Sequence, residues 1–131
     1  MRSAQCRFLC IFALLLACSN PTAPDPTGVW GGPDASLVLS RTGGTLSYPC
    51  GAGTIDSTWT LSRDGQFTGT GQHFFGGGPE PIEGRPPHPA LYAGHIDRNT
   101  LVLTVTLTDL GQTMGPFRLL RGGPLVQEQC V

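Results

Sequence analysis

Apolar and polar residues alternate along several short stretches of the chain, with the period of two that is typical of half-buried strands. The clearest stretch is 100–108, where the apolar residues Leu101, Leu103, Val105 and Leu107 alternate mainly with threonines. Shorter stretches with the same pattern are 35–40, 58–62, 66–72 and 117–119. Each stretch predicts a β-strand with one face in a core.

Turn-forming residues separate these stretches. Groups rich in Gly, Asn, Asp and Pro stand at 42–44, 63–65, 97–99, 109–111 and 122–124. Such residues favour the tight links of β-hairpins. About eight short strands with tight links predict an all-β fold, either a small antiparallel up-and-down β-barrel or a compact sandwich. Gly69 and Gly71 share one face of the 66–72 stretch, where glycine permits the bending that barrel closure needs.

One long connection, 73–89, is rich in Gly and Pro and lacks this alternation. Long connections within compact domains are often functional. Its apolar residues would form a binding patch if they are exposed, or would cover one barrel end if they fold back. We predict a ligand-binding or partner-binding site here, formed by His73, Phe74, Phe75, Ile82 and Arg85.

The first 18 residues have the features of an export signal. Arg2 and Arg7 accompany an apolar run that is too short to span a bilayer. The sequence Leu15-Leu16-Ala17-Cys18 resembles the bacterial lipobox. This resemblance implies cleavage before Cys18 and acylation of that residue, which would anchor the protein in a membrane. The alternative is an ordinary leader, cut after Ser19, that releases a soluble protein.

The leader also defines the expected organisation of the chain. Residues 1–17 are the predicted signal peptide, and 18–26 contain the lipidated cysteine and a proline-rich extended tether. Residues 27–131 form one predicted β domain, because the remaining length suits a single core. The expected location is the cell envelope, where Ser19 favours the outer membrane over the inner membrane.

The cysteines fit the same interpretation. The sequence has five, of which Cys6 and Cys10 leave with the leader and Cys18 takes the lipid. Cys50 and Cys130 remain, and an oxidising compartment would join them in a disulfide. Such a bond typically stabilises a fold by about 2–4 kcal/mol. The alternatives are two free thiols or half of a metal site.

Charge and motifs argue against several functions. From Cys18 onward the chain has six arginines, nine acidic residues and no lysine, so it lacks the basic face that nucleic-acid binding requires. The G-x-S-x-G, H-E-x-x-H and Walker-type patterns are absent from the sequence. We therefore expect no enzyme and no cofactor. His73, His88 and His95 lack a diagnostic metal-ligand spacing, so we also expect no metal.

Two resemblances support the barrel. The segment Thr27-Gly28-Val29-Trp30 resembles the G-x-W of the first strand in lipocalins and in small periplasmic barrel inhibitors of metalloproteases. That resemblance implies that the Trp closes one barrel end. Further elements are similar to those of bacterial lipoproteins without assigned activity, namely 50–55, 77–79, 92–94 and Cys130. The second resemblance bears only on the fold and on the cellular location.

These observations predict a non-enzymatic, membrane-anchored envelope lipoprotein whose barrel binds a protein partner or a small apolar ligand. The alternative is an inhibitor of a protease or lysozyme, with the 73–89 connection or the N-terminal segment in the target's cleft. An enzyme with an unrecognised site is a third hypothesis. An apolar cavity of several hundred Å³ would favour a ligand carrier, whereas a filled core suits an inhibitor.

Overall fold

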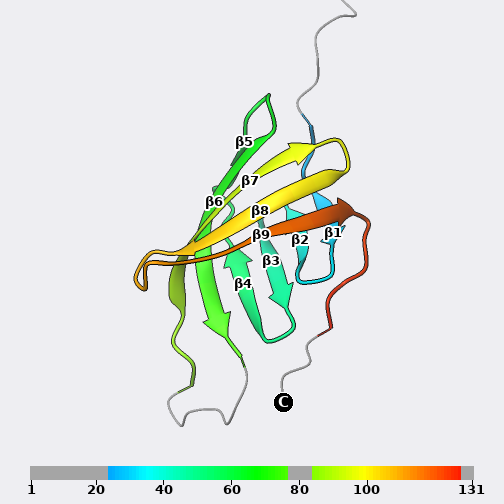
Figure 1. The fold of residues 1–131 in the computed structure, drawn as a ribbon. Helices are drawn as coiled ribbons and strands as arrows, with labels where there is room; N and C mark the ends of the chain where they lie inside the picture. The colour runs from blue at the N-terminus through cyan, green and yellow to red at the C-terminus, as the bar shows by residue number, and fades with distance from the viewer. Residues whose placement is uncertain (1–23, 77–83, 128–131) are drawn as a thin grey trace, which may run out of the picture.

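The computed structural model describes residues 24–76 and 84–127, which form nine β-strands and, within these ranges, no helix (Figure 1). The first four strands are β1 (Gly28–Gly31), β2 (Ser36–Ser40), β3 (Gly43–Tyr48) and β4 (Gly51–Ile55). The others are β5 (Thr60–Leu61), β6 (Gln66–Phe75), β7 (His88–Asp97), β8 (Thr100–Leu107) and β9 (Gln112–Arg121). The predicted all-β class is confirmed.

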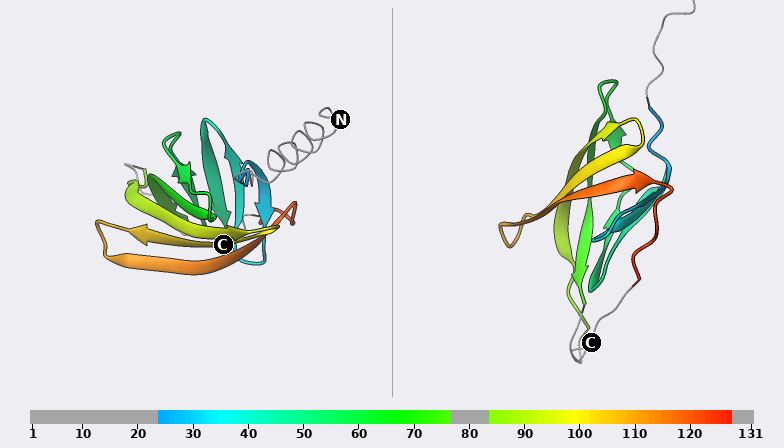
Figure 2. Two further views of the ribbon diagram at one scale, coloured as in Figure 1. Left: turned by 90° about the horizontal axis from the view of Figure 1, so that it is seen from above. Right: turned by 45° about the vertical axis from the view of Figure 1, so that its right-hand side comes forward.

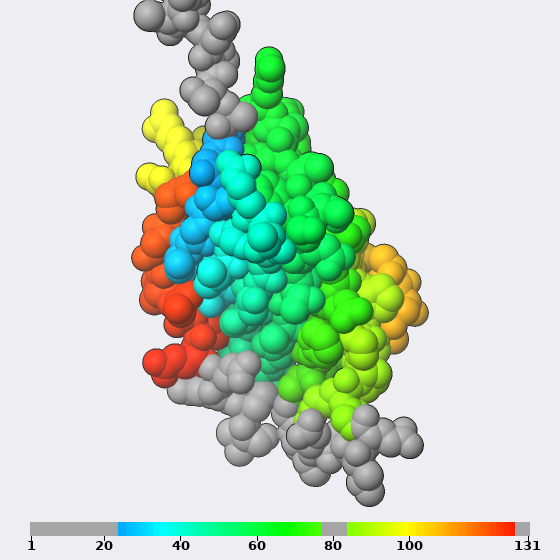
Figure 3. All heavy atoms as spheres, turned by 180° about the vertical axis from the view of Figure 1, so that it is seen from behind, coloured from blue at the N-terminus to red at the C-terminus, as the bar shows by residue number. Residues whose placement is uncertain are grey.

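Eight of the strands close into an antiparallel up-and-down barrel. Neighbours in sequence pair from β1 to β4 and from β6 to β9, while the β4–β6 and β1–β9 pairs close the ring. The short strand β5 adds to β6. Figure 2 shows β1 to β4 and β7 to β9 on opposite sides of the barrel, and Figure 3 shows the outer wall that β1 to β4 form. The barrel, and not the sandwich, is therefore correct.

Large side chains fill the interior of the barrel. The alternation in β8 places Leu101, Leu103, Val105 and Leu107 in the core, as predicted, and each is at most 2 % exposed. Opposite sides of the ring contribute larger side chains to the same cluster, and those of Trp30, Phe67 and Tyr92 are fully buried. The axis of the barrel therefore holds protein side chains.

The β4–β6 pair depends on one glycine. Gly71 lies opposite Ile55 in this pair. A Cβ atom added to Gly71 would lie 1.8 Å from the carbonyl oxygen of Thr54 and 2.8 Å from its carbonyl carbon. Both are backbone atoms, so any side chain would push the two strands apart. Gly71 thus serves barrel closure, as its position on the strand predicts.

The β1–β9 pair is short and leaves a gap beside it. Only Trp30 and Gly31 of β1 pair with β9, opposite Arg121 and Leu120. Continuing this register by two residues would place Pro33 opposite Arg118, and proline has no N–H to donate to a ladder. The chain turns away there. Among the described residues, β9 from Phe117 to Leu119 pairs only with β8.

The connection between β6 and β7 is shorter at both ends than the predicted 73–89. His73, Phe74 and Phe75 end β6, and His88 begins β7. His73 and His88 lie opposite each other on these two strands. The β6–β7 ladder thus extends beyond the residues in which apolar and polar side chains alternate. Ile82 lies outside the described residues.

The cysteine predictions also fall largely outside the described part of the chain. Cys50 stands between β3 and β4, where its carbonyl oxygen accepts a hydrogen bond of 3.3 Å from the Gly76 N–H. Cys130 and Cys18 lie outside the described residues, as does the leader 1–17. The disulfide and the lipid anchor therefore stay predictions.

Candidate functional site

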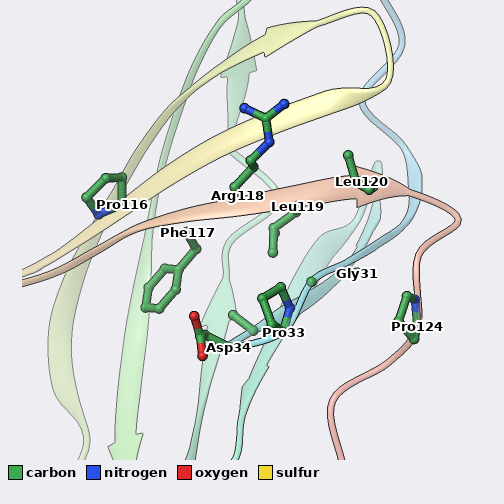
Figure 4. Close-up of a pocket in the computed structure, with 11 residues that line it drawn as sticks. Gly31, Pro33, Asp34, Pro116, Phe117, Arg118, Leu119, Leu120 and Pro124 are labelled. Atoms are coloured by element: carbon green, nitrogen blue, oxygen red, sulfur yellow. The ribbon is translucent and has the colours of Figure 1, made fainter.

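A cleft of about 520 Å³ opens where β9 separates from β1. Phe117 and Leu119 of β9 point toward Pro33 and Asp34 of the β1–β2 loop, whereas Arg118 points to the other face of the strand (Figure 4). This arrangement follows from the alternation of β9 and from the turn that Pro33 imposes on β1. The cleft therefore lies beside the closing strands, and two residues of the core cluster, Ala35 and Leu119, form part of its wall.

The walls of the cleft are mostly apolar. Leu119 and Ala35 are buried at its base, Phe117 is half-buried, and Pro33 is exposed at the rim. Asp34 brings a carboxylate to the same rim. An apolar concavity of a few hundred Å³ with a small number of polar groups is typical of small-molecule sites. The cleft has room for a small organic molecule.

An aromatic cluster, which consists of Tyr48, His73, Phe75, His88 and Phe117, continues from the cleft across the same end of the barrel. The ring centroids of Phe117 and Tyr48 are 5.4 Å apart, and those of Tyr48 and His73 are 5.3 Å apart. Phe75 lies 4.7 Å from His73 and 5.2 Å from His88. Tyr48 and His73 are thus separated from the cleft by the ring of Phe117.

Two polar atoms in this cluster lack hydrogen-bond partners. Within the described residues, Tyr48 Oη and His73 Nδ1 are the buried side-chain N and O atoms without one. Tyr48 is 8 % exposed and His73 is 2 % exposed. In contrast, the Tyr92 hydroxyl in the same interior donates a hydrogen bond of 2.9 Å to the Gln72 carbonyl. A buried polar group without a partner costs about 1–3 kcal/mol, so this pair needs an explanation.

Both of these groups are uncharged near neutral pH, and burial favours the uncharged form of each. It raises the pKa of the Tyr48 hydroxyl, to which nearby Tyr92 also contributes. Burial also lowers the pKa of the His73 imidazole, with a further contribution from the charge of His88. The usual pKa of tyrosine is about 10 and that of histidine about 6.5, so both shifts favour the neutral form.

The three histidines do not form a metal site. His88 Nδ1 pairs with Asp109 Oδ2 at 2.7 Å, and His95 Nδ1 lies 3.1 Å from Gln66 Nε2 at the other end of β7. In residues 24–76 and 84–127 no group of three or more His, Cys, Asp or Glu side chains is placed to hold a metal ion. His73 packs in the aromatic cluster instead.

The structure brings together only part of the predicted binding site. His73 and Phe75 lie in the aromatic cluster, but burial removes His73 from any exposed patch. Phe74 is half-buried and pairs with Ala52 across β4 and β6, and Arg85 is half-buried in the connection before β7. Sequence reasoning missed the cleft and Tyr48. The signal for the cleft is Pro33, which follows β1 after one residue and has no N–H to donate to a strand ladder.

Comparison of the chain with protein-family models, with curated proteins and with solved structures gives no match. The fold and the site alone therefore define the class: a closed eight-stranded antiparallel barrel with a filled interior and an apolar cleft beside its closing strands. In the part of the chain that the structure describes, no helix has the length and hydropathy of a membrane span.

Proposed function

We propose that the protein is a non-enzymatic binding module of the bacterial cell envelope that holds a small apolar ligand in the cleft between β9 and the β1–β2 loop. The cleft itself carries this proposal, with its volume of about 520 Å³ and its apolar walls. Because core side chains fill the barrel axis, the ligand binds beside the barrel and not along its axis.

Binding would be driven by removal of apolar surface from water, at about 25 cal/mol per Å². Leu119 and Ala35 are buried in the free protein, so the base of the cleft is already formed. A site that is formed before binding spends less free energy on ordering its side chains. The filled core thus supports a rigid base for the cleft.

The probe N-phenyl-1-naphthylamine, which fluoresces in apolar surroundings, tests the cleft. We expect saturable binding at one site per chain and at least tenfold weaker binding in Asp34→Trp, because the indole would fill the cleft. Val38→Trp is the matched control, since Val38 is 46 % exposed on β2 and does not line the cleft. Equal binding by the two variants, or no saturable binding to the wild type, would contradict the proposal.

The proposed location in the cell envelope depends on the resemblance of Leu15-Leu16-Ala17-Cys18 to the lipobox. We propose an anchor on Cys18, in the outer membrane in preference to the inner membrane. Intact-mass spectrometry of the protein expressed in bacteria is expected to show acylated Cys18 in the wild type and no acylation in Cys18→Ala. An unacylated mature mass in the wild type would refute the anchor.

The alternative function as a protease or lysozyme inhibitor depends largely on 77–83 and on residues before 24, which lie outside the described residues.

A further inference from the structure

The two unpartnered atoms of the aromatic cluster stand out against the rest of the interior. Tyr92 donates its hydroxyl hydrogen to Gln72, and the indole Nε1 of Trp30 donates to the Pro26 carbonyl at 2.8 Å. Among residues 24–76 and 84–127, Tyr48 Oη and His73 Nδ1 have no such partner. Since native interiors pair nearly all of their buried polar groups, an unpaired couple on adjacent rings indicates a place where something else binds.

The couple lies next to the cleft. The Phe117 ring lines the cleft and contacts Tyr48, and Tyr48 contacts His73. Phe117 belongs to the segment of β9 that has no strand partner toward β1 among the described residues, and its side chain is only half-buried. Displacement of this one ring would join the apolar cleft to the two polar atoms.

We infer that the ligand of this cleft is amphipathic, with an apolar body in the cleft and one uncharged hydroxyl or carbonyl group that hydrogen-bonds to Tyr48 Oη and His73 Nδ1. This inference rests on the proposed function. A tyrosine hydroxyl donates or accepts, and a neutral imidazole nitrogen does one or the other according to its tautomer, so both kinds of polar group are matched.

The chemistry of the site disfavours a charged group at this position. Both partners are neutral near pH 7, and a buried ion without an opposite charge is strongly penalised. The Asp34 carboxylate at the rim further disfavours an anionic ligand. The ligand class is therefore an apolar alcohol, phenol, ketone or ester, and not a fatty acid anion.

Biphenyl and 4-hydroxybiphenyl test this inference, because they share one body and differ in one hydroxyl. Each would displace N-phenyl-1-naphthylamine from the purified protein. We expect the hydroxylated compound to bind the wild type about 3- to 10-fold more tightly, the ratio that one net hydrogen bond provides. In Tyr48→Phe this ratio is expected to fall to about twofold or less. In the control Tyr92→Phe, whose hydroxyl is already paired, the ratio is expected to persist.

The outcomes separate the two proposals. Absence of saturable probe binding to the wild type would refute the proposed function. Where the probe binds, failure of 4-hydroxybiphenyl to displace it would refute only the amphipathic ligand. Displacement without a preference in the wild type, or a preference that survives in Tyr48→Phe, would refute only the amphipathic ligand.

Urea unfolding of the free protein gives a second readout that does not need a ligand. A buried hydroxyl without a partner costs stability, so Tyr48→Phe is expected to keep or raise the urea midpoint, whereas Tyr92→Phe, which loses a hydrogen bond, lowers it. Equal losses in both variants would show that Tyr48 already has a partner and would overturn the inference.

Discussion

Replacement of Trp30 with alanine is expected to lower the free energy of unfolding by about 3–5 kcal/mol, the usual range for a buried tryptophan. Trp30 is fully buried, and its Nε1 donates to the Pro26 carbonyl. The Arg121 guanidinium lies 4.3 Å from the centroid of its ring. The substitution removes the largest core side chain at the closing strands and leaves a cavity there.

Urea unfolding followed by far-UV circular dichroism measures this loss. Arg121→Ala is the control, because it removes the cation–π contact and the hydrogen bonds to the Asp25 and Thr27 carbonyls but leaves the indole in place. A cation–π contact at an exposed site contributes about 0.5–1 kcal/mol. The expectation is wrong if Trp30→Ala costs no more than Arg121→Ala. Trp30→Phe, which keeps one ring, is expected to fall between the two and guards against complete unfolding of the alanine variant.

Gly71→Ala is expected to destabilise the barrel by about 3 kcal/mol or more, at or above the upper end of the usual cost of overpacking. The added methyl group would meet the backbone of Thr54 at 1.8 Å. Backbone atoms of a paired strand cannot move without breaking part of the β4–β6 ladder. The change therefore acts on barrel closure and not only on local packing.

Gly69→Ala is the matched control for this variant, since both glycines lie on one face of β6. A Cβ atom at Gly69 would meet side-chain atoms, Ile55 Cγ2 at 3.0 Å and Trp59 Cβ at 3.3 Å, which can shift by a few tenths of an ångström. Thermal unfolding should therefore show a clearly larger loss for Gly71→Ala. Equal losses in the two variants would mean that close approach at Gly71 does not determine closure.

The most regular strands of this protein and their core residues are predictable from its sequence, because buried and exposed residues alternate along them with a period of two. Leu101 to Leu107 show this, and the face that contains Phe67, Gly69 and Gly71 continues to His73, which is also buried. The continuation was missed because Phe74, Phe75 and the glycines after them break the alternation. Because Phe74 is an aromatic residue on the otherwise polar face of β6, the alternation does not show where this strand ends. β3 and β4 were not among the predicted stretches.

The cleft was not predictable in the same way. Its two walls come from the first and last strands of the barrel, which are distant in sequence and meet only because the ring closes. The alternation within a strand indicates which of its faces is buried, but it does not indicate which other strand pairs with it. Likewise, 43–48 was not predicted as a strand, and only the three-dimensional arrangement shows that Tyr48 is buried and that its hydroxyl has no partner within the described residues.

The pairing of β1 with β9 also limits when the barrel can close. A chain made from its N-terminus cannot close this ring until Arg121 has been synthesised, however early β1 to β4 pair with one another. Until then Trp30 has neither the Arg121 side chain over its ring nor a partner strand on one side. Contacts between residues so far apart in sequence slow folding. Until β9 is made, the free edge of β1 therefore lacks its strand partner, and an unpaired edge is a ready site for pairing with another chain.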